Sequence, residues 1–241
     1  DRSSAASDVY KRQFQGYYFA RPVILSGKKL APSQIAIMQL MALIMADADT
    51  TEIERNIKKD ASLVLTLLRL ANTPGVGVTQ RIDSLGQALT VLGRRQLQRW
   101  LQIILYAEHN KGSHFTSPLL QLATTRGKLL ELITEKLRPD NRAMADTAFT
   151  VGIMSLMDTL FGQSMEEILD QVSVVSEVTD ALLYRKGFYG DLLKLAEYIE
   201  QIEKTGVLLI PTLQKLHLSI EDLYALQLTA FEWSNNVSVC V

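Results

Sequence analysis

Three histidines have the side chains best suited to bind a transition metal or to move protons near neutral pH: His109, His114 and His217. His109 and His114 are five residues apart, whereas two ligands on one helical face need a spacing of three or four. His217 lies far along the chain from both. The single cysteine, Cys240, excludes a disulfide framework and a thiolate zinc cage, and favours a reducing, cytoplasmic compartment. We therefore expect no metal site and no cofactor.

Motifs for covalent or phosphate chemistry are also missing from the sequence. It has no Gly-x-Ser-x-Gly turn and no phosphate-binding loop, and Gly75-Val76-Gly77 is an isolated pair of glycines that predicts a loop turn. The paired carboxylates Glu52/Glu54 and Glu166/Glu167 fall on predicted solvent-facing helix surfaces. No catalytic residue is predicted.

Arg94, Arg95 and Arg99 form a basic cluster beside Trp100, a combination that can bind nucleic acid through charge and stacking. The chain carries 25 basic and 26 acidic residues and so a net charge of −1, which supplies no long-range attraction for a polyanion. The sequence therefore favours a solvated helix edge, and nucleic acid is not an expected partner.

The composition is that of a folded globular chain: 241 residues, 47% hydrophobic and 21% charged. No signal peptide is apparent, and the longest apolar stretch, residues 35–45, is too short to span a bilayer, which needs about 20 residues. We expect no membrane contact. The methionines Met38, Met41 and Met45 in this stretch fill the core or supply an adaptable interface.

Helix signals repeat from Pro32 to the end, and strand signals are scarce, so the expected fold is an all-α bundle. Thr51 with Glu54 predicts a capping box, Asp60 predicts an N-cap, and Gly93 predicts a left-handed helix end. The predicted helices cover about 32–45, 51–59, 60–71, 84–92, 94–109, 117–137, 141–161, 164–171, 176–185, 189–205, 211–217 and 219–235.

Helical spacing also predicts which side chains are buried and which residue holds a turn. Asn72 is expected to stabilise a turn rather than contact a ligand. The expected core includes Leu63, Leu67, Leu70, Leu89, Leu92, Phe149, Ile153 and Leu156.

Two segments carry a family resemblance. Gln15-Gly16-Tyr17-Tyr18-Phe19-Ala20-Arg21-Pro22 resembles the end of EAL domains, the cyclic-di-GMP phosphodiesterase barrels. Residues 60–73 and 82–93, with Leu67-Leu68-Arg69-Leu70-Ala71-Asn72-Thr73 at their centre, resemble HDOD domains. This order is that of a bacterial EAL–HDOD signalling family. It implies an EAL remnant and linker over 14–29 and an HDOD domain over 30–236. Residues 1–13 are polar and have no helix or strand period, so we expect a disordered lead or a sequence artefact there, and residues 237–241 are assigned to a tail.

HDOD domains are similar in fold to HD-type metal phosphohydrolases but generally lack their metal ligands. The resemblance places Ser155 and Leu156 at the positions of the metal-binding His-Asp pair, and neither can replace that pair. Asp158 lies close by among apolar neighbours and is a poor substitute. Gln15 matches an active-site glutamine of EAL enzymes, but the acidic metal ligands of that barrel are absent from this sequence.

The resulting hypothesis is a non-catalytic signalling domain that acts through contacts with proteins, or with a second copy of itself, in cyclic-di-GMP-related regulation. Two alternatives stay open from the sequence alone. One is a divergent metal-dependent phosphohydrolase, and the other is a regulator that binds a cyclic dinucleotide or RNA without turnover.

Overall fold

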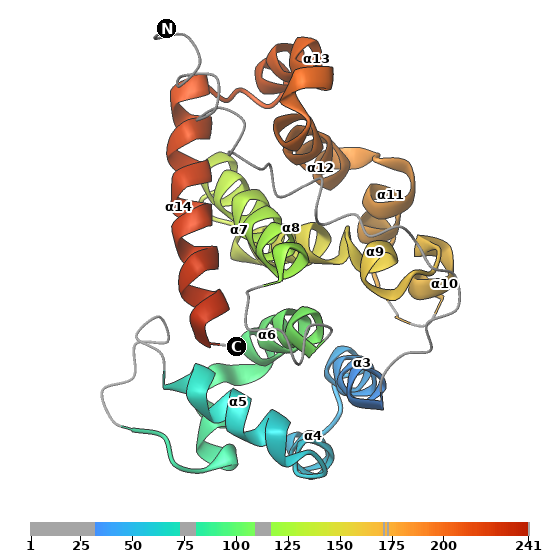
Figure 1. The fold of residues 1–241 in the computed structure, drawn as a ribbon, viewed down its shortest axis with the longest axis vertical. Helices are drawn as coiled ribbons and strands as arrows, with labels where there is room; N and C mark the ends of the chain where they lie inside the picture. The colour runs from blue at the N-terminus through green and yellow to red at the C-terminus, as the bar shows by residue number, and fades with distance from the viewer. Residues whose placement is uncertain (1–31, 73–80, 109–116, 171, 173, 241) are drawn as a thin grey trace, which may run out of the picture.

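The computed structural model describes residues 32–72, 81–108, 117–170, 172 and 174–240, and every regular element in those ranges is an α-helix (Figure 1). The all-α prediction is confirmed. The helices are α3 (Pro32–Met45), α4 (Thr50–Ile57), α5 (Ala61–Ala71), α6 (Leu85–Glu108), α7 (Pro118–Leu137), α8 (Arg142–Met154), α9 (Met157–Phe161), α10 (Met165–Leu169), α11 (Ser176–Tyr184), α12 (Gly187–Glu200), α13 (Ile202–Lys215) and α14 (Ile220–Cys240).

The helices form two groups that meet at α6. Helices α3, α4 and α5 pack against α6 in the lower part of Figure 1, and α7 and α8 form the centre of the upper part. Helix α14 runs along α7, whereas α11 and α12 contact α8 and α13 packs on α12. Because α6 also contacts α7 and α8, one continuous hydrophobic core joins both groups.

The predicted core is confirmed: all eight apolar side chains named from helical spacing are buried. Met41 is buried and Met38 is half-buried against the core, which supports a packing role for these two methionines. The side chain of Met45 lies outside the described part of the structure. None of the described helices is long and apolar enough to span a membrane.

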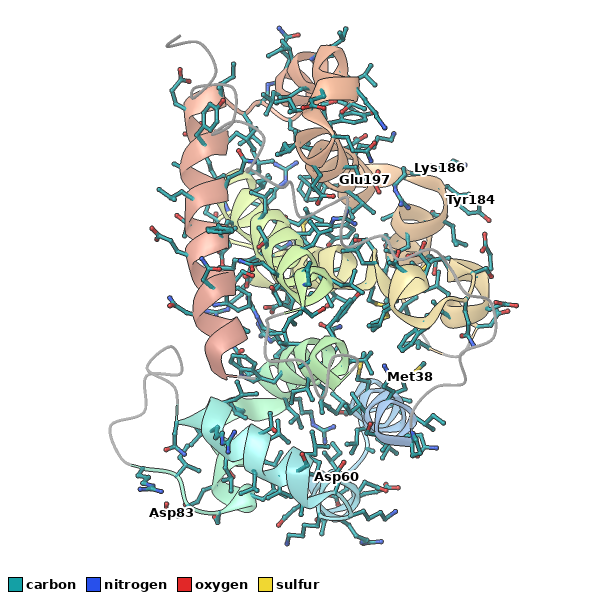
Figure 2. All side chains as sticks on the ribbon, viewed as in Figure 1. Met38, Asp60, Asp83, Tyr184, Lys186 and Glu197 are labelled. Carbon is teal, nitrogen blue, oxygen red and sulfur yellow. The ribbon has the colours of Figure 1, made fainter. Side chains whose placement is uncertain are left out.

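Two polar residues fix the backbone around α5 as predicted. Asp60 caps the helix and accepts hydrogen bonds from the backbone N–H groups of Ser62 and Leu63 (Figure 2). The Asn72 amide donates to the carbonyl of Ile82 at 2.9 Å and accepts from the N–H of Ile82 at 2.8 Å. Asn72 therefore joins the two ends of segment 73–80, in which the predicted Gly75-Val76-Gly77 turn lies outside the described residues.

Glycines act at two places in the helical frame. Gly93 has a φ of 64° and bends α6 between residues 85–92 and 94–108, which confirms the predicted break. Gly152 of α8 lies against Gly127 of α7, where an added Cβ at position 152 would be 2.6 Å from the Gly127 Cα. Helices α7 and α8 therefore cross in direct backbone contact.

Several predicted helix boundaries were wrong, including the end of the helix predicted over 189–205, which lies at Glu200. Asp49, not Thr51, caps α4, because its carboxylate accepts the Thr51 N–H and the helix begins one residue earlier. The helix predicted over 141–161 ends at Met154, and Ser155 and Leu156 separate α8 from α9.

The C-terminal helices are also longer than predicted. Helix α13 begins at Ile202 and contains Pro211, because a proline costs one backbone hydrogen bond without preventing a helix that packs on α12. Helix α14 continues through 237–240, which the sequence analysis assigned to a tail, and Val237 is buried there. Residues 1–13 and the proposed EAL remnant over 14–29 lie outside the described residues.

Candidate functional site

The predicted position of the metal pair lies at the break between α8 and α9. Ser155 is buried, and its hydroxyl donates to the Gly152 carbonyl at 2.6 Å. The same oxygen accepts a hydrogen bond from Nη1 of Arg126 at 2.6 Å. Leu156 is buried in the hydrophobic core. A buried guanidinium therefore occupies the polar side of this position.

Arg126 comes from α7 and is held by two partners. Its Nε and Nη2 donate to the two carboxylate oxygens of Glu200 on α12, at 2.9 and 2.5 Å. Burial acts to lower the pKa of Arg126, but the charge and hydrogen bonds of Glu200 outweigh it and raise that pKa. A permanent positive charge next to Ser155 opposes a divalent cation, and the hydroxyl already uses its donor and an acceptor position.

The other candidate metal ligands do not converge in the described structure. Asp158 accepts from the backbone N–H of Thr159, and His217 is exposed in the turn between α13 and α14. Within the described ranges no group of three or more His, Cys, Asp or Glu side chains is placed to hold a metal ion. Gln15, His109, His114 and the side chain of Cys240 lie outside the described part of the chain.

The basic cluster of α6 is mostly not the solvated edge that the sequence predicted. Arg94 donates to the Ala48 carbonyl, and Trp100 is buried. The side chain of Arg99 is only 13% exposed. The reason is tertiary packing, because helices far away in the sequence cover this face of α6. Only Arg95, with 63% of its side chain exposed, has the predicted exposure.

Arg99 joins four helices in a compact cluster. Its guanidinium donates twice to Glu131 of α7, at 2.6 and 2.7 Å. The same group lies 3.7 Å from the ring centre of Phe149 on α8 and 4.8 Å from that of Trp233 on α14. Burial raises the pKa of Glu131, but hydrogen bonds and charge from Arg99 and Lys128 outweigh this and hold the pKa below its ordinary value.

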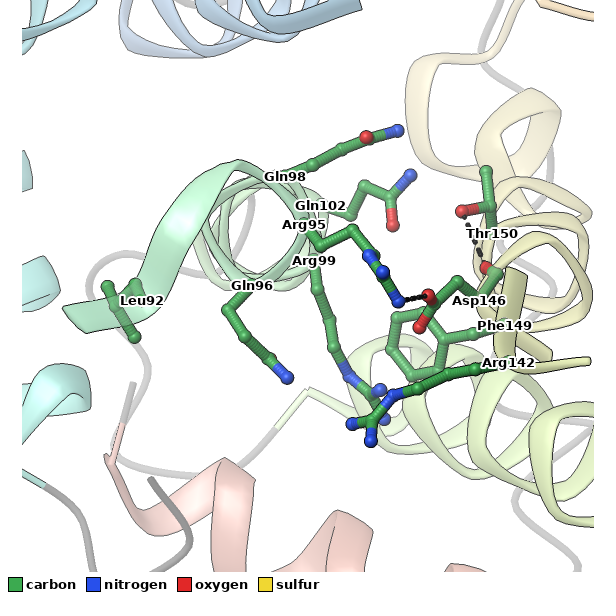
Figure 3. A pocket seen from close by; sticks show the side chains of 10 residues that line it. All are labelled: Leu92, Arg95, Gln96, Gln98, Arg99, Gln102, Arg142, Asp146, Phe149 and Thr150. Carbon is green, nitrogen blue, oxygen red and sulfur yellow. Dashed lines mark hydrogen bonds and ion pairs between the residues drawn. The ribbon is translucent and has the colours of Figure 1, made fainter. Parts of the chain in front are cut away.

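A cleft of about 350 Å³ opens beside Arg99, between α6 and α8 (Figure 3). Arg95 lies across it and donates to Asp146 of α8 at 2.6 Å. Sequence reasoning missed this site, although Arg95, Arg99 and Gln102 are spaced i, i+4, i+7 and share one helical face. The lining residues are Leu92, Arg95, Gln96, Gln98, Arg99, Gln102, Arg142, Asp146, Phe149 and Thr150.

The fold agrees with one class of protein. The HDOD domain family matches residues 30–181, more than half of the sequence, and the chain belongs to that family. The all-helical architecture is consistent with this membership. No solved structure matches the chain.

Two relatives align with almost the whole chain. The "Uncharacterized protein YuxH" of Bacillus subtilis is 28% identical over 228 residues, which cover 93% of this chain and 54% of the relative. The "Cyclic di-GMP phosphodiesterase CdgJ" of Vibrio cholerae is also 28% identical over 228 residues, which cover 93% of this chain and 51% of that protein. The chain therefore spans about half the length of the curated relatives that it matches.

Proposed function

We propose that this HDOD domain is a non-catalytic signalling module that acts through protein contacts in cyclic-di-GMP-related regulation. The observation that carries the proposal is the Arg126–Glu200 pair bonded to Ser155. An HD-type hydrolase would need a divalent cation at this position, and a buried guanidinium fixed by a mostly buried carboxylate disfavours one. Helix packing and an ion pair therefore take the place that metal-binding side chains have in HD-type hydrolases.

An apolar stripe on α14 supports the role in protein contacts. Ile220, Tyr224, Leu228 and Phe231 follow each other at spacings of four, four and three residues, and their side chains are 44–67% exposed. Such spacing places them on one face of the helix. A connected apolar face of this kind is typical of an interaction surface, either with another protein or with a second copy of the chain.

The pathway is proposed from one relative. The Vibrio cholerae protein is named a cyclic di-GMP phosphodiesterase, and this chain matches about half of it. A domain without a hydrolytic centre would then regulate or relay the signal of such an enzyme rather than cleave the dinucleotide. We also propose a cytoplasmic location, because cyclic dinucleotides are made and used inside the cell.

Turnover assays test the non-catalytic part. The purified chain, incubated with cyclic-di-GMP and with nucleoside monophosphates in the presence of Mg²⁺ or Mn²⁺, is expected to release no nucleotide and no phosphate above a buffer control. Metal analysis of the same preparation is expected to find no stoichiometric iron, manganese or zinc. If metal-dependent release of nucleotide or phosphate co-elutes with the protein in chromatography, the result would instead support the divergent phosphohydrolase.

Site-directed photocrosslinking tests the contact surface. A photoreactive amino acid at Leu228 in the α14 stripe is expected to give a discrete crosslinked product in cells. The same amino acid at Glu52, an exposed position on α4, serves as the matched control and is expected to give none. Equal yields from both positions, or no product from Leu228, would contradict the proposal.

A further inference from the structure

The cleft between α6 and α8 is lined by a buried polar side chain that has no hydrogen-bond partner in the described structure. Gln102 is 1% exposed, and neither its Nε2 nor its Oε1 has a hydrogen-bond partner within the described structure. An unpaired buried amide costs free energy, so packing alone favours an apolar residue at this position. The side chain lines the cleft and points from α6 toward α8 (Figure 3).

The charged residues that line the cleft are mostly basic. Arg95, Arg99 and Arg142 face it, and Asp146 is the one carboxylate among the lining residues. Arg142 is exposed, and no carboxylate in the described part of the chain lies within ion-pair distance of it. A guanidinium without a partner is a ready donor to a phosphate group.

The amide of Gln102 and the guanidinium of Arg142, both unpaired within the described residues, lie toward opposite ends of the cleft. In Figure 3 Gln102 lies toward Thr150, whereas Arg142 reaches in from the other end of α8. Positions 142 and 150 are about 12 Å apart along the axis of α8, at a rise of about 1.5 Å per residue. A ligand that pairs with both Gln102 and Arg142 must be elongated. It must be anionic at the end near Arg142, and it must donate and accept hydrogen bonds at the end near Gln102.

We propose that this cleft binds a nucleoside monophosphate, which is a ligand beyond the protein contacts proposed above. The edge of a nucleobase offers the adjacent donor and acceptor that a glutamine amide pairs with. Arg142 and Arg95 bind the phosphate, and Arg95 breaks its ion pair with Asp146 to do so. The volume of about 350 Å³ is within the range of small-molecule sites.

The Arg95–Asp146 ion pair closes the site in the free protein. It bridges α6 and α8 at 2.6 Å and is partly exposed, with side chains 63% and 30% accessible. An ion pair with this much exposure is weak, so a phosphate that offers more negative charge displaces Asp146. Opening of this pair gives the ligand access to the amide of Gln102.

Titration calorimetry on the purified chain tests the proposal, with AMP, GMP, UMP and inorganic phosphate as probes. At least one nucleotide is expected to bind clearly more tightly than phosphate alone. Gln102→Leu is expected to weaken that binding about tenfold or more, and Arg142→Gln to weaken it about tenfold. Asp146→Asn is expected to tighten binding about threefold or more, because it removes the competing carboxylate.

Two controls separate loss of binding from loss of fold. Gln102→Leu is expected to leave the melting temperature unchanged or higher, since it removes an unpaired buried amide. Arg138→Gln removes the same charge from an exposed site outside the cleft and is expected to leave binding unchanged. The proposal is overturned if no probe binds, if phosphate binds as tightly as every nucleotide, or if Gln102→Leu binds like the parent chain.

Discussion

Two arginines, Arg126 buried and Arg99 partly buried, form similar arginine–glutamate ion pairs in different surroundings. Arg126 and Arg99 each donate twice to a glutamate from another helix, yet 2% of the Arg126 side chain is exposed, compared with 13% for Arg99. Arg126 is enclosed by Glu200 and Ser155, whereas Arg99 lies against two aromatic rings beside an open cleft. The first pair fills the position that the family resemblance assigned to a metal-binding pair, and the second lies in the wall of a candidate ligand site.

The largest effect is expected at the more enclosed pair. Arg126→Leu leaves Glu200 without its partner in a mostly buried position and should lower the free energy of unfolding by about 3–5 kcal/mol. Urea denaturation followed by circular dichroism measures this. The double variant Arg126→Leu/Glu200→Leu should recover most of the loss. A loss below about 1 kcal/mol for the single variant would show that the pair is not fully buried in solution.

A smaller loss is expected at the cluster beside the cleft. Arg99→Leu should cost about 2–3 kcal/mol, because Glu131 keeps Lys128 as a second partner at 2.9 Å. Arg99→Lys is the matched control: it keeps the charge but loses the double hydrogen bond and the stacking on Phe149. Denaturation should therefore place Arg99→Lys between the leucine variant and the parent chain. If Arg99→Lys were as stable as the parent chain, the positive charge of Arg99 alone would account for its contribution to the free energy of unfolding.

The acid dependence of stability should report on Glu131. Its pKa is lower in the folded state than its ordinary value of 4.5. The ionised carboxylate therefore stabilises the fold above that value, and the contribution is lost as the pH falls through the lower folded pKa. Glu131→Gln should show a weaker loss of stability on acidification than the parent chain. Urea midpoints measured from about pH 7 down to about pH 3 test this, and parallel curves for both proteins would refute it.

The smallest effect is expected at the exposed pair. Arg95→Gln breaks the contact with Asp146 and should change the free energy of unfolding by less than about 1 kcal/mol. Added salt should reduce even that difference, since an exposed pair is screened. Thermal unfolding at low and high ionic strength provides the measurement. A loss as large as that of Arg99→Leu would mean that Arg95 helps to hold α6 against α8.

Local signals in the sequence predicted most of the helical frame. Asp60, Asn72 and Gly93 act through neighbours within ten residues, and each has the expected role. Helical spacing identified the core correctly because burial repeats with the period of the helix. Pro211 misled the prediction of α13, since a proline lowers helix propensity without forbidding a helix that gains tertiary packing.

The candidate sites depend on contacts that no local pattern contains. Arg126 and Glu200 are 74 residues apart, and Arg99 and Glu131 are 32 apart. A charged residue on a helix is normally solvated, so the basic face of α6 was interpreted as an exposed edge. The family resemblance located Ser155 and Leu156, but only the packing of α7 against α8 and α12 shows what lies next to them.

The contact between Gly127 and Gly152 has a mechanical consequence. At this crossing the backbones of α7 and α8 touch, and the Ile153 and Phe149 side chains of α8 pack directly over Gly127, so tilting one helix toward the other would create a steric clash. We therefore expect α7 and α8 to keep a fixed position relative to each other. Once the Arg95–Asp146 pair has opened, any helix movement that widens the cleft further is expected in α6 rather than between α7 and α8. Because α6 also packs on α3, α4 and α5, such a movement would alter the packing at the opposite end of the molecule.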